Sequence, residues 1–436
     1  MHIPHSLAQI QSASLPETTD VAIIGSGITG TSVAKFLLEG RPDTHVTILE
    51  ARTLCSGATG RNGGHLVTFG GAGYSALKAQ HGADEAAKIL KFAQDTCDQL
   101  LETAKEMARD ESEIRPVTRV RAFGDAESLE EVKRSVAAYE LDHPAMRGRF
   151  EFIDGKQALE VQRFGNHHVA GAALFPAAAL WPYRFVLKVI EHLRNIYSAR
   201  LSIEANTPVT DVQYLPDLRV SHPYALRTPR GNIYARQVVY CTNGYTSHLL
   251  PELRGRLFPK RATMTVQDLI GLAPNRGDST SWNLHQKARY DPNIDAILNG
   301  SYYLQQNANS GFFFFGGEAQ IAHTALTSDD TNASAVSVQH LVDKLSEFFG
   351  IEHENNDALV SSWSGIMGFT PDSLPLAGKL PSSITLRDGD GEWIAAGFNG
   401  GGMCLCWRVG EAIAKQITVE TCPIGFLRPS LCPRCA

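Results

Sequence analysis

Long hydrophobic runs are absent from this chain of 436 residues, and no apolar stretch approaches the roughly 20 residues that span a bilayer. The first 19 residues also lack the apolar core flanked by positive charge that marks a secretory signal. Basic residues form no stripe, and the formal net charge is -6 at pH 7, which argues against a nucleic-acid partner. These absences predict a cytoplasmic protein with no membrane association and a small-molecule partner.

Cysteine is also scarce, because 8 residues at irregular spacing are too few for a disulfide scaffold in so long a chain. Three thiols, Cys422, Cys432 and Cys435, lie in the C-terminal tail at 421–436 without a nearby histidine. A zinc site there lacks its fourth ligand, so we expect a reduced tail. No Ser/His/Asp set or metal-ligand cluster is apparent elsewhere, and we expect no metal.

Hydrophobic periodicity changes repeatedly along the chain. Apolar residues cluster as in buried strands at 21–24 and 46–49, with a helix between them, and recur at helical spacing from 84 to 107. A helix is predicted to begin at Pro182, and strands are predicted between 209 and 240 and between 302 and 316. A strand at 393–396 and a helix at 406–416 are predicted near the end of the chain. Interleaved helices and strands predict a mixed α/β fold.

A glycine-rich turn follows the first predicted strand and opens the first helix. Its residues are Gly25, Ser26, Gly27, Ile28, Thr29 and Gly30. In this context the three glycines permit a tight turn, close approach of a pyrophosphate and close helix–strand packing. Glu50 ends the second strand, where its carboxylate can accept hydrogen bonds from a ribose hydroxyl. The motif predicts a Rossmann-type site for FAD or NAD.

The loop after Glu50 favours the larger cofactor. It continues through Ala51 and Arg52 into RTLCSGATGRNGG, which is rich in glycine and hydroxyl groups and has no apolar period. At residues 57–64, GATGRNGG, the chain resembles the D-amino-acid-oxidase/glycine-oxidase superfamily of FAD enzymes, especially its γ-glutamylputrescine-oxidoreductase-like branch. Segments at 171–182, 238–250, 315–317, 363–378 and 392–402 resemble further parts of that family in the same order.

The resemblance implies two domains. A Rossmann-type FAD-binding domain is expected at 15–75, 165–255 and 355–420. A substrate domain built on a mixed, largely antiparallel sheet is expected at 76–164 and 256–354.

The resemblance also implies cofactor contacts beyond the glycine turn. Ser56 and Thr59 match hydroxyls near the pyrophosphate, and the loop that lies beneath the flavin ring in the family follows them. Val209 matches the residue whose backbone meets the adenine. Thr242 lies in the segment that returns to the FAD domain. A C-terminal glycine turn matches the backbone N–H groups that face the pyrimidine edge of the flavin. The loop comprises Arg61, Asn62, Gly63 and Gly64, and the turn comprises Asn399, Gly400, Gly401, Gly402 and Met403.

The chain departs from the family where relatives bind a substrate carboxylate. Met367 stands at the position of an arginine in amino-acid-oxidising members, and Cys404 at that of a lysine in the sarcosine-oxidase group. An amine or a modified amino acid is therefore expected as substrate, unless Lys260, Arg261 or Arg184 supplies the charge.

Two further residues are predicted for the substrate pocket together with Met367. His65 directly follows the flavin loop, and its alternatives are a covalent flavin link, a polar role beside flavin or substrate, and a structural role. We expect non-covalent FAD. Tyr303, with Tyr302 and Phe315, suits either an apolar amine cage or the core.

The implied reaction is oxidation of a C–N bond by hydride transfer to flavin N5, which gives an imine, with O2 or another molecule as electron acceptor. A flavin monooxygenase or an NAD-dependent dehydrogenase would share the glycine motif. A flavin-binding scaffold without turnover is the third alternative.

Overall fold

The computed structural model describes residues 5–68, 70–162, 169–293, 295–298, 300–317, 319–321, 324–351 and 358–418. The predicted reduced tail at 421–436 lies outside these residues.

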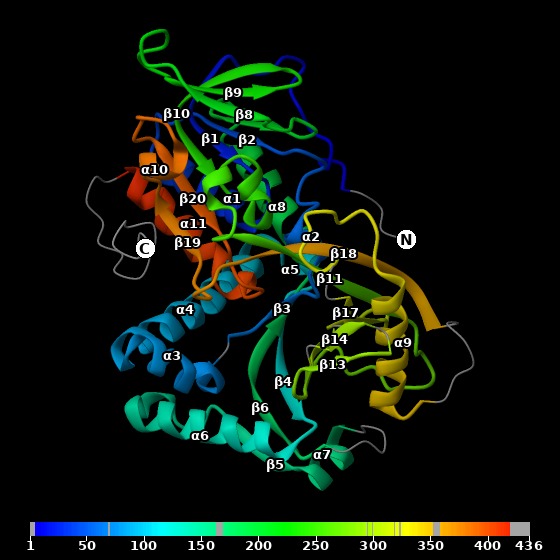
Figure 1. Ribbon diagram of the computed structural model, residues 1–436. Helices are drawn as coiled ribbons and strands as arrows, with labels where there is room; N and C mark the ends of the chain where they lie inside the picture. Colours follow the sequence, from blue (N-terminus) through cyan, green and yellow to red (C-terminus); the bar gives the residue numbers. More distant parts are fainter. Residues whose placement is uncertain are drawn as a thin grey trace.

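The first sheet lies at one end of the molecule (Figure 1). Its strands are β1 (Thr18–Ile24), β2 (Val46–Leu49), β7 (Leu201–Glu204), β8 (Asp211–Tyr214), β9 (Tyr224–Thr228), β10 (Gly231–Tyr240), β19 (Leu376–Lys379) and β20 (Glu392–Ala396). They follow the order β19-β20-β10-β1-β2-β7, with β9 and β8 added beside β10. The pairs from β20 to β7 are parallel, which confirms the predicted Rossmann-type arrangement.

The second sheet is largely antiparallel. Its strands are β3 (His65–Leu66), β4 (Arg115–Phe123), β5 (Glu151–Asp154), β6 (Gly171–Ala179), β11 (Phe258–Gln267), β12 (Thr280–His285), β15 (Ser301–Gln306), β16 (Phe313–Gly316) and β18 (Leu359–Phe369). The order is β18-β11-β16-β15-β12-β4-β6-β3, with β5 beside β6. Only the pair of β12 with β4 is parallel among the pairs described in this sheet. A small third sheet joins β13 (Arg289–Asp291), β14 (Ala296–Leu298) and β17 (Ala319–Ile321).

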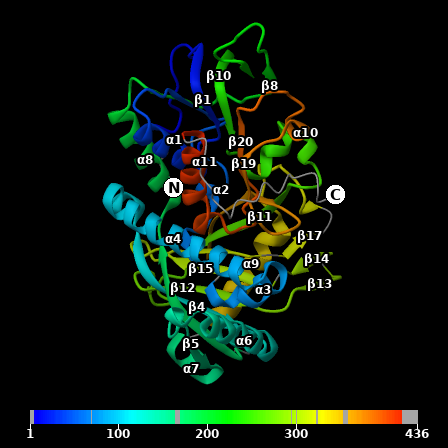
Figure 2. The same ribbon diagram turned by 90° about the vertical axis from the view of Figure 1, so that its left-hand side faces the viewer.

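Helices cover both sheets. They are α1 (Ile28–Gly40), α2 (Ala58–Arg61), α3 (Tyr74–His81), α4 (Ala83–Met107), α5 (Arg109–Ser112), α6 (Ala126–Asp142), α7 (Gly155–Gln162), α8 (Pro182–Ile196), α9 (Ala335–Phe349), α10 (Ser382–Thr385) and α11 (Cys406–Thr418). Short 3-10 turns include η3 (Asn243–His248) and η7 (Gly402–Cys404). Helices α1, α8 and α11 lie with the first sheet, and α6 and α7 lie at the opposite end (Figure 1 and Figure 2).

Burial explains where the predicted helices form. The helix predicted over 84–107 is α4, and Leu90, Cys97 and Leu100 on its apolar stripe are buried. Helix α8 begins at Pro182 as predicted, since proline has no N–H to lose at a first helical position. Phe185 and Leu193 of α8 join the core on one face of the first sheet.

The two faces of the second sheet differ. Alternate residues of a strand point to opposite faces, and one face carries Val120, Trp282 and Leu304, which pack with Leu341 and Leu345 of α9. The other face carries the residues between them, such as Arg119, Arg121 and Asn283, and borders a cavity. The sheet therefore has an apolar face toward α9 and a polar face toward the candidate site.

Strand pairing places three strands differently from the predicted domains. β3, β6 and β18 fall within the ranges 15–75, 165–255 and 355–420 expected for the FAD domain, yet β3 pairs with β6, β6 with β4, and β18 with β11. All three belong by hydrogen bonding to the second sheet, because the chain crosses between the sheets at these points. The remaining boundaries stay a prediction.

In the described part of the chain, no helix combines the length and apolar character that crossing a membrane requires.

Candidate active site

A cavity of about 1100 Å³ lies between the carboxyl ends of the parallel strands and the polar face of the second sheet. Ile24, Leu49, Cys241 and Phe398 line it at the ends of four neighbouring strands of the first sheet or directly after them. This is the edge where open α/β sheets bind ligands.

Two of the motif glycines are required by sterics. Gly25 has a φ of +107°, and a Cβ on it would lie 2.7 Å from the carbonyl oxygen of Cys241. A Cβ on Gly30 would lie 2.0 Å from the carbonyl oxygen of Gly25, so only glycine lets α1 approach the turn. Gly27 precedes α1 as its N-cap and offers no capping side chain. The turn thus leaves the start of the helix accessible to a phosphate.

Glu50 is held by the turn itself. Its Oε2 accepts hydrogen bonds from the backbone N of Ser26 at 3.1 Å and from the Ser26 hydroxyl at 2.7 Å. Its Oε1 accepts from the backbone N of Arg52 at 3.1 Å. Ser26 is fully buried and in turn accepts from Cys55 N at 2.8 Å. The predicted ribose acid is therefore fixed at the cavity wall, whereas Ser26 acts by holding it there.

The loop after the turn is fixed by its own side chains. The Asn62 Oδ1 atom accepts from Gly64 N at 2.7 Å, and the Asn62 Nδ2 atom donates to the carbonyl of Thr59 at 3.0 Å. Thr59 Oγ1 accepts from Ile28 N at 3.1 Å, which ties α2 to the start of α1. The Ser56 hydroxyl is buried without a hydrogen-bond partner in the described structure.

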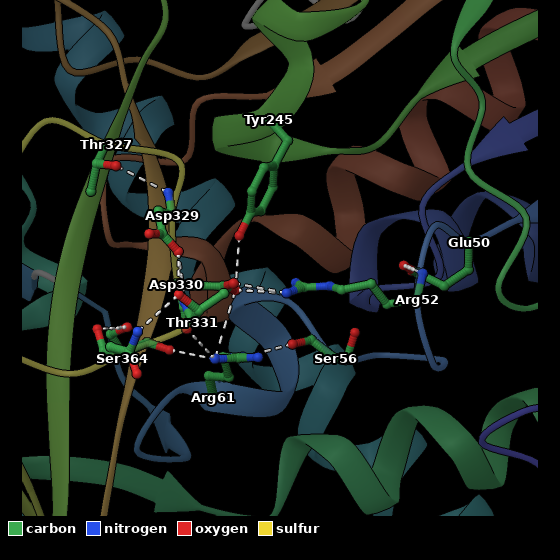
Figure 3. Close-up of polar contacts among 11 residues, drawn as sticks. Glu50, Arg52, Ser56, Arg61, Tyr245, Thr327, Asp329, Asp330, Thr331 and Ser364 are labelled. Atoms are coloured by element: carbon green, nitrogen blue, oxygen red, sulfur yellow. Dashed lines mark hydrogen bonds and ion pairs between the residues drawn. The ribbon is translucent and has the colours of Figure 1, made fainter.

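An ionic cluster joins this loop to the segment 324–334 (Figure 3). Arg52 Nη1 donates to the two Asp330 carboxylate oxygens at 2.8 and 3.0 Å, and the Tyr245 hydroxyl donates to Oδ2 at 2.8 Å. Arg61 Nη1 donates to the Asp330 carbonyl at 3.1 Å and to the Ser364 carbonyl at 2.7 Å. We call Arg52, Arg61, Tyr245 and Asp330 the latch.

Opposing effects set the pKa of Asp330. Burial tends to raise the pKa of this carboxyl, but hydrogen bonds from Arg52 and Tyr245 and the charges of Arg61 and Arg52 outweigh burial and hold the pKa below its ordinary value. The latch is therefore ionised at neutral pH and closes one side of the cavity.

The C-terminal glycine turn borders the cavity from the other side. Asn399 has a φ of +52° and Gly400 a φ of +78°. Asn399 Oδ1 accepts from Thr370 N at 2.8 Å, and Asn399 N donates to the Gly368 carbonyl at 2.9 Å, so the turn is pinned to the end of β18. The short helix η7 follows directly.

Most of the predicted cofactor residues line this one cavity. The lining residues are Gly25, Gly27, Ile28, Thr29, Glu50, Ala51, Arg52, Thr59, Arg61, Asn62, Gly63, Val209, Thr242, Asn399, Gly400, Gly401, Gly402 and Met403. Ser26, Gly30, Ser56 and Gly64 do not line it, since they support the turn and the loop from behind. Their direct contact with a cofactor stays a prediction.

His65 lies on the cavity wall beside the polar face of the second sheet. Arg119 Nη1 lies 2.7 Å from His65 Nδ1, and because a guanidinium can only donate, His65 accepts at Nδ1 and carries its proton on Nε2. Burial lowers the pKa of His65 well below its ordinary value, and the charges of Arg119 and Arg115 lower it further. His65 is thus neutral, and its buried Nε2 has no hydrogen-bond partner in the described structure.

Two arginines that the sequence analysis did not single out line the same wall. Arg119 and Arg121 lie two residues apart on β4, and Arg119 is only 6% exposed. Their signal in the sequence was the alternation of arginine and apolar residues in RPVTRVRAF, whose faces only the fold can assign. Burial and the charge of Arg121 lower the pKa of Arg119 to about 9, which leaves the guanidinium cationic at neutral pH.

Met367 lines the cavity as predicted, and a Cβ on Gly400 would lie 3.6 Å from its sulfur. Its partner across the strands is Lys260 of β11, which also lines the cavity. Arg184 instead pairs with Glu113 at 3.1 Å, and Arg261 does not line the cavity. Of the three alternative cations, Lys260 is the one at the site.

Cys404 lines the cavity as well, and burial raises the pKa of its thiol to about 12. It is therefore a neutral group where some relatives carry a lysine.

The three aromatic residues considered for the pocket lie on opposite faces of the second sheet. Tyr303 lines the cavity, and its ring meets that of His65 edge to face at 6.0 Å between centroids. For Tyr302 and Phe315 the sequence allowed either an amine cage or the core, and they stack on each other in the core against α9. Tyr302 and Tyr303 are consecutive in β15, so their rings must face opposite sides of the sheet.

Three features of the cavity suit a dinucleotide: a helix start with no capping side chain, a glycine turn that only glycine can form beside that start, and a buried Nε2 atom of His65 without a hydrogen-bond partner in the described structure. Comparison with known proteins identifies the family. The profile described as DAO, FAD dependent oxidoreductase, matches residues 20–416. The chain belongs to this family. The match confirms three predictions: membership of this family, FAD as the cofactor, and an oxidoreductase as the class of enzyme.

Individual relatives agree with this assignment. Gamma-glutamylputrescine oxidoreductase of Escherichia coli (strain K12) is 22% identical over 403 residues, which cover 92% of this chain and 84% of that protein. Probable oxidoreductase OrdL of Rhizobium meliloti (strain 1021) is 22% identical and covers 94% and 85%. The crystal structure of glycine oxidase from Geobacillus kaustophilus has a TM-score of 0.69 at 20% identity, covering 94% of this chain and 98% of that one, and it confirms the predicted fold class.

Among the described residues, no group of three or more His, Cys, Asp or Glu side chains is arranged to hold a metal ion.

Proposed function

We propose that this family member oxidises a carbon–nitrogen bond of an amine or amino acid, with O2 as the final electron acceptor. Two relatives bear names that point to such substrates, gamma-glutamylputrescine oxidoreductase and glycine oxidase. The observation that carries the proposal is the single cavity that joins the dinucleotide turn at Gly25 to the polar sheet face at Tyr303. It gives cofactor and substrate a common space.

Bound FAD supplies a two-electron acceptor for hydride. The substrate loses a hydride from its α-carbon and a proton from its nitrogen, and the imine that results is hydrolysed by water to a carbonyl compound and a released amine or ammonia. The chain's own contribution is positioning. We assign the buried Nε2–H of His65 to donate a hydrogen bond to an acceptor on the ligand, since it has no partner in the described structure.

Neutral side chains line the cavity beside Gly63. Tyr303, Met264 and Met367 line the cavity, and a Cβ on Gly63 would meet the first two at 3.4 Å. Such packing excludes water from the space beside Gly63, which protects an imine until it leaves.

The test is a reductive half-reaction. The purified protein should be yellow, and its visible flavin bands should bleach when a panel of amines and amino acids is added without oxygen, with free FAD as control. Readmitting air should restore the bands and release hydrogen peroxide.

If the protein is yellow but no member of the panel bleaches it, it binds flavin without the proposed activity, and the proposal is refuted. Bleaching without peroxide on reoxidation would refute O2 as the acceptor and keep the amine chemistry.

A further inference from the structure

The polar face of the second sheet holds the buried Arg119 and the half-buried Arg121, and the charge of Glu131 acts on Arg121 without a direct ion pair among the described residues. Arg119 Nη1 contacts only neutral groups, His65 at 2.7 Å and the Ser281 hydroxyl at 3.4 Å. The Nε atom of Arg121 is buried and lacks a hydrogen-bond partner, and its guanidinium lies 5.3 Å from the centre of the Phe123 ring. Within the described residues, no carboxylate pairs with either arginine.

The acids of the cavity do not fill this role. They are Glu50, Asp329 and Asp330, which lie at the cofactor turn and on the segment 324–334. Glu50 is bonded to Ser26, and Asp330 to Arg52. A buried cation without a direct anionic partner costs several kcal/mol, and an anion bound in the cavity would offset that cost at Arg119 and Arg121.

Neighbouring strands complete a polar floor around the arginines. In the register of β12 with β4, Ser281 lies opposite Arg119 and Asn283 opposite Arg121. His285 lies one step further on the same face, and its buried Nδ1 has no hydrogen-bond partner in the described structure. The Ser281 hydroxyl and the His285 ring can donate to an oxygen anion, whereas Asn283 Nδ2 already donates to the Tyr302 carbonyl at 2.7 Å. A guanidinium fork matches the two oxygens of a carboxylate.

We propose that Arg119 and Arg121 form a carboxylate-binding subsite, so that the substrate of the proposed oxidation is an amine that carries a carboxylate. This inference rests on the proposed function for the identity of the ligand as substrate. It differs from the expectation drawn from Met367 and Cys404, which favoured an amine or a modified amino acid unless Lys260, Arg261 or Arg184 supplied the charge.

The subsite is far from the position that Met367 occupies. Met367 lies on β18, and five strand-to-strand steps along the sheet lead from β18 to β4. At about 4.8 Å a step, the path along the sheet is roughly 24 Å, shortened in space by curling. A carboxylate at Arg121 therefore lies at β4, away from β18 and past Tyr303 on β15, on the side of the sheet order toward β3, which carries His65.

Binding is tested first, by calorimetric titration of the FAD-loaded protein with glutarate and with its uncharged diamide, glutaramide. Glutarate should bind and glutaramide should not. Arg121→Gln should weaken glutarate binding about tenfold or more, since a hydrogen bond to a charged group is lost, and Arg121→Lys should lose less. Arg134→Gln, an exposed arginine on α6, is the matched control and should bind as the wild type does.

Equal affinity for glutarate and glutaramide in the wild-type protein overturns the subsite, and so does unchanged glutarate binding in Arg121→Gln. The wild-type comparison stands even if that variant fails to fold.

Turnover is tested second, by oxygen-free bleaching with glycine, sarcosine and 4-aminobutyrate against methylamine, dimethylamine and propylamine, which lack only the carboxylate. Faster bleaching by the acids supports the proposal, and faster bleaching by the amines refutes it. If no compound bleaches the flavin while Arg121-dependent glutarate binding persists, the subsite stands and the proposed oxidation fails. If amines bleach it and glutarate does not bind, the oxidation stands and the subsite fails.

Discussion

Replacing Asp330 by asparagine tests whether the latch ties the segment 324–334 to the cofactor loop. Asparagine keeps the shape of the side chain and removes its charge, leaving Arg52 without an anionic partner at 2.8 Å and Arg61 without one at 3.7 Å. Asp330 is 6% exposed, but the Arg52 side chain is 39% exposed, so water recovers part of the lost interaction. We therefore expect the free energy of unfolding to fall by about 2 kcal/mol, a value between those typical of breaking an exposed and a buried ion pair.

The assay is urea unfolding of the FAD-loaded protein at neutral pH, together with the rate at which FAD dissociates on dilution. Asp330→Asn should unfold at lower urea concentration and release FAD faster, because Arg52 and Arg61 border the cavity. Asp329→Asn is the matched control, since Asp329 accepts from Thr331 within its own turn and does not contact the arginines. If the two variants match each other in both assays, the latch contributes neither stability nor cofactor retention.

The same substitution has a pH signature. The pKa of Asp330 in the folded protein lies below its ordinary 3.8, so its contribution is fully present above that value and is lost as pH falls through the lower folded pKa. The difference in unfolding free energy between wild type and Asp330→Asn should therefore shrink at acid pH. A difference that stays constant from pH 7 to pH 3 would contradict an ionic latch.

Further predictions concern the turn, the cofactor bond and the pocket. Gly30→Ala should lower the unfolding free energy by about 3 kcal/mol or more, since its Cβ meets backbone, whereas Gly40→Ala in the same helix meets nothing within 4 Å and should be nearly neutral, as thermal melts can show. FAD should be released into the supernatant by acid precipitation, because we predict a non-covalent cofactor; a yellow pellet would mean a covalent link, with His65 the first residue to examine. Met367→Arg should lower kcat/KM for the best substrate, because it adds a cation directly across from Lys260; an unchanged value would place Met367 outside the substrate's path.

The sequence was informative where the chemistry is local. Gly25, Gly30 and Glu50 lie within a single strand–helix–strand unit, and the short-range rules that govern such a unit predict their positions. The C-terminal turn at Asn399 is similarly local, since a positive φ and an adjacent helix are set by neighbouring residues. These parts of the site could be predicted before any long-range contact was known.

The other half of the site depends on pairings that no local pattern records. Arg119 reaches His65 across 54 positions, and Arg52 reaches Asp330 across 278. Alternating arginines in a strand ordinarily indicate a solvated face, and only the packing of α9 on the opposite face turns those of β4 into a cavity wall. Whether Tyr302 faces the pocket or the core stayed open in the sequence for the same reason, because alternation gives two faces and does not say which is the core.

The strand pairing also fixes where the arginines of the cavity lie relative to Met367. With Met367 on β18, a substrate acid has no arginine there, yet Arg119 and Arg121 provide two on β4. In the proposed subsite the acid end of the substrate is again the end that is fixed, but it is held at β4, five strand-to-strand steps from Met367 on β18. Acid recognition then needs no cation at position 367, and the amine would approach the glycine turns from the side of β4.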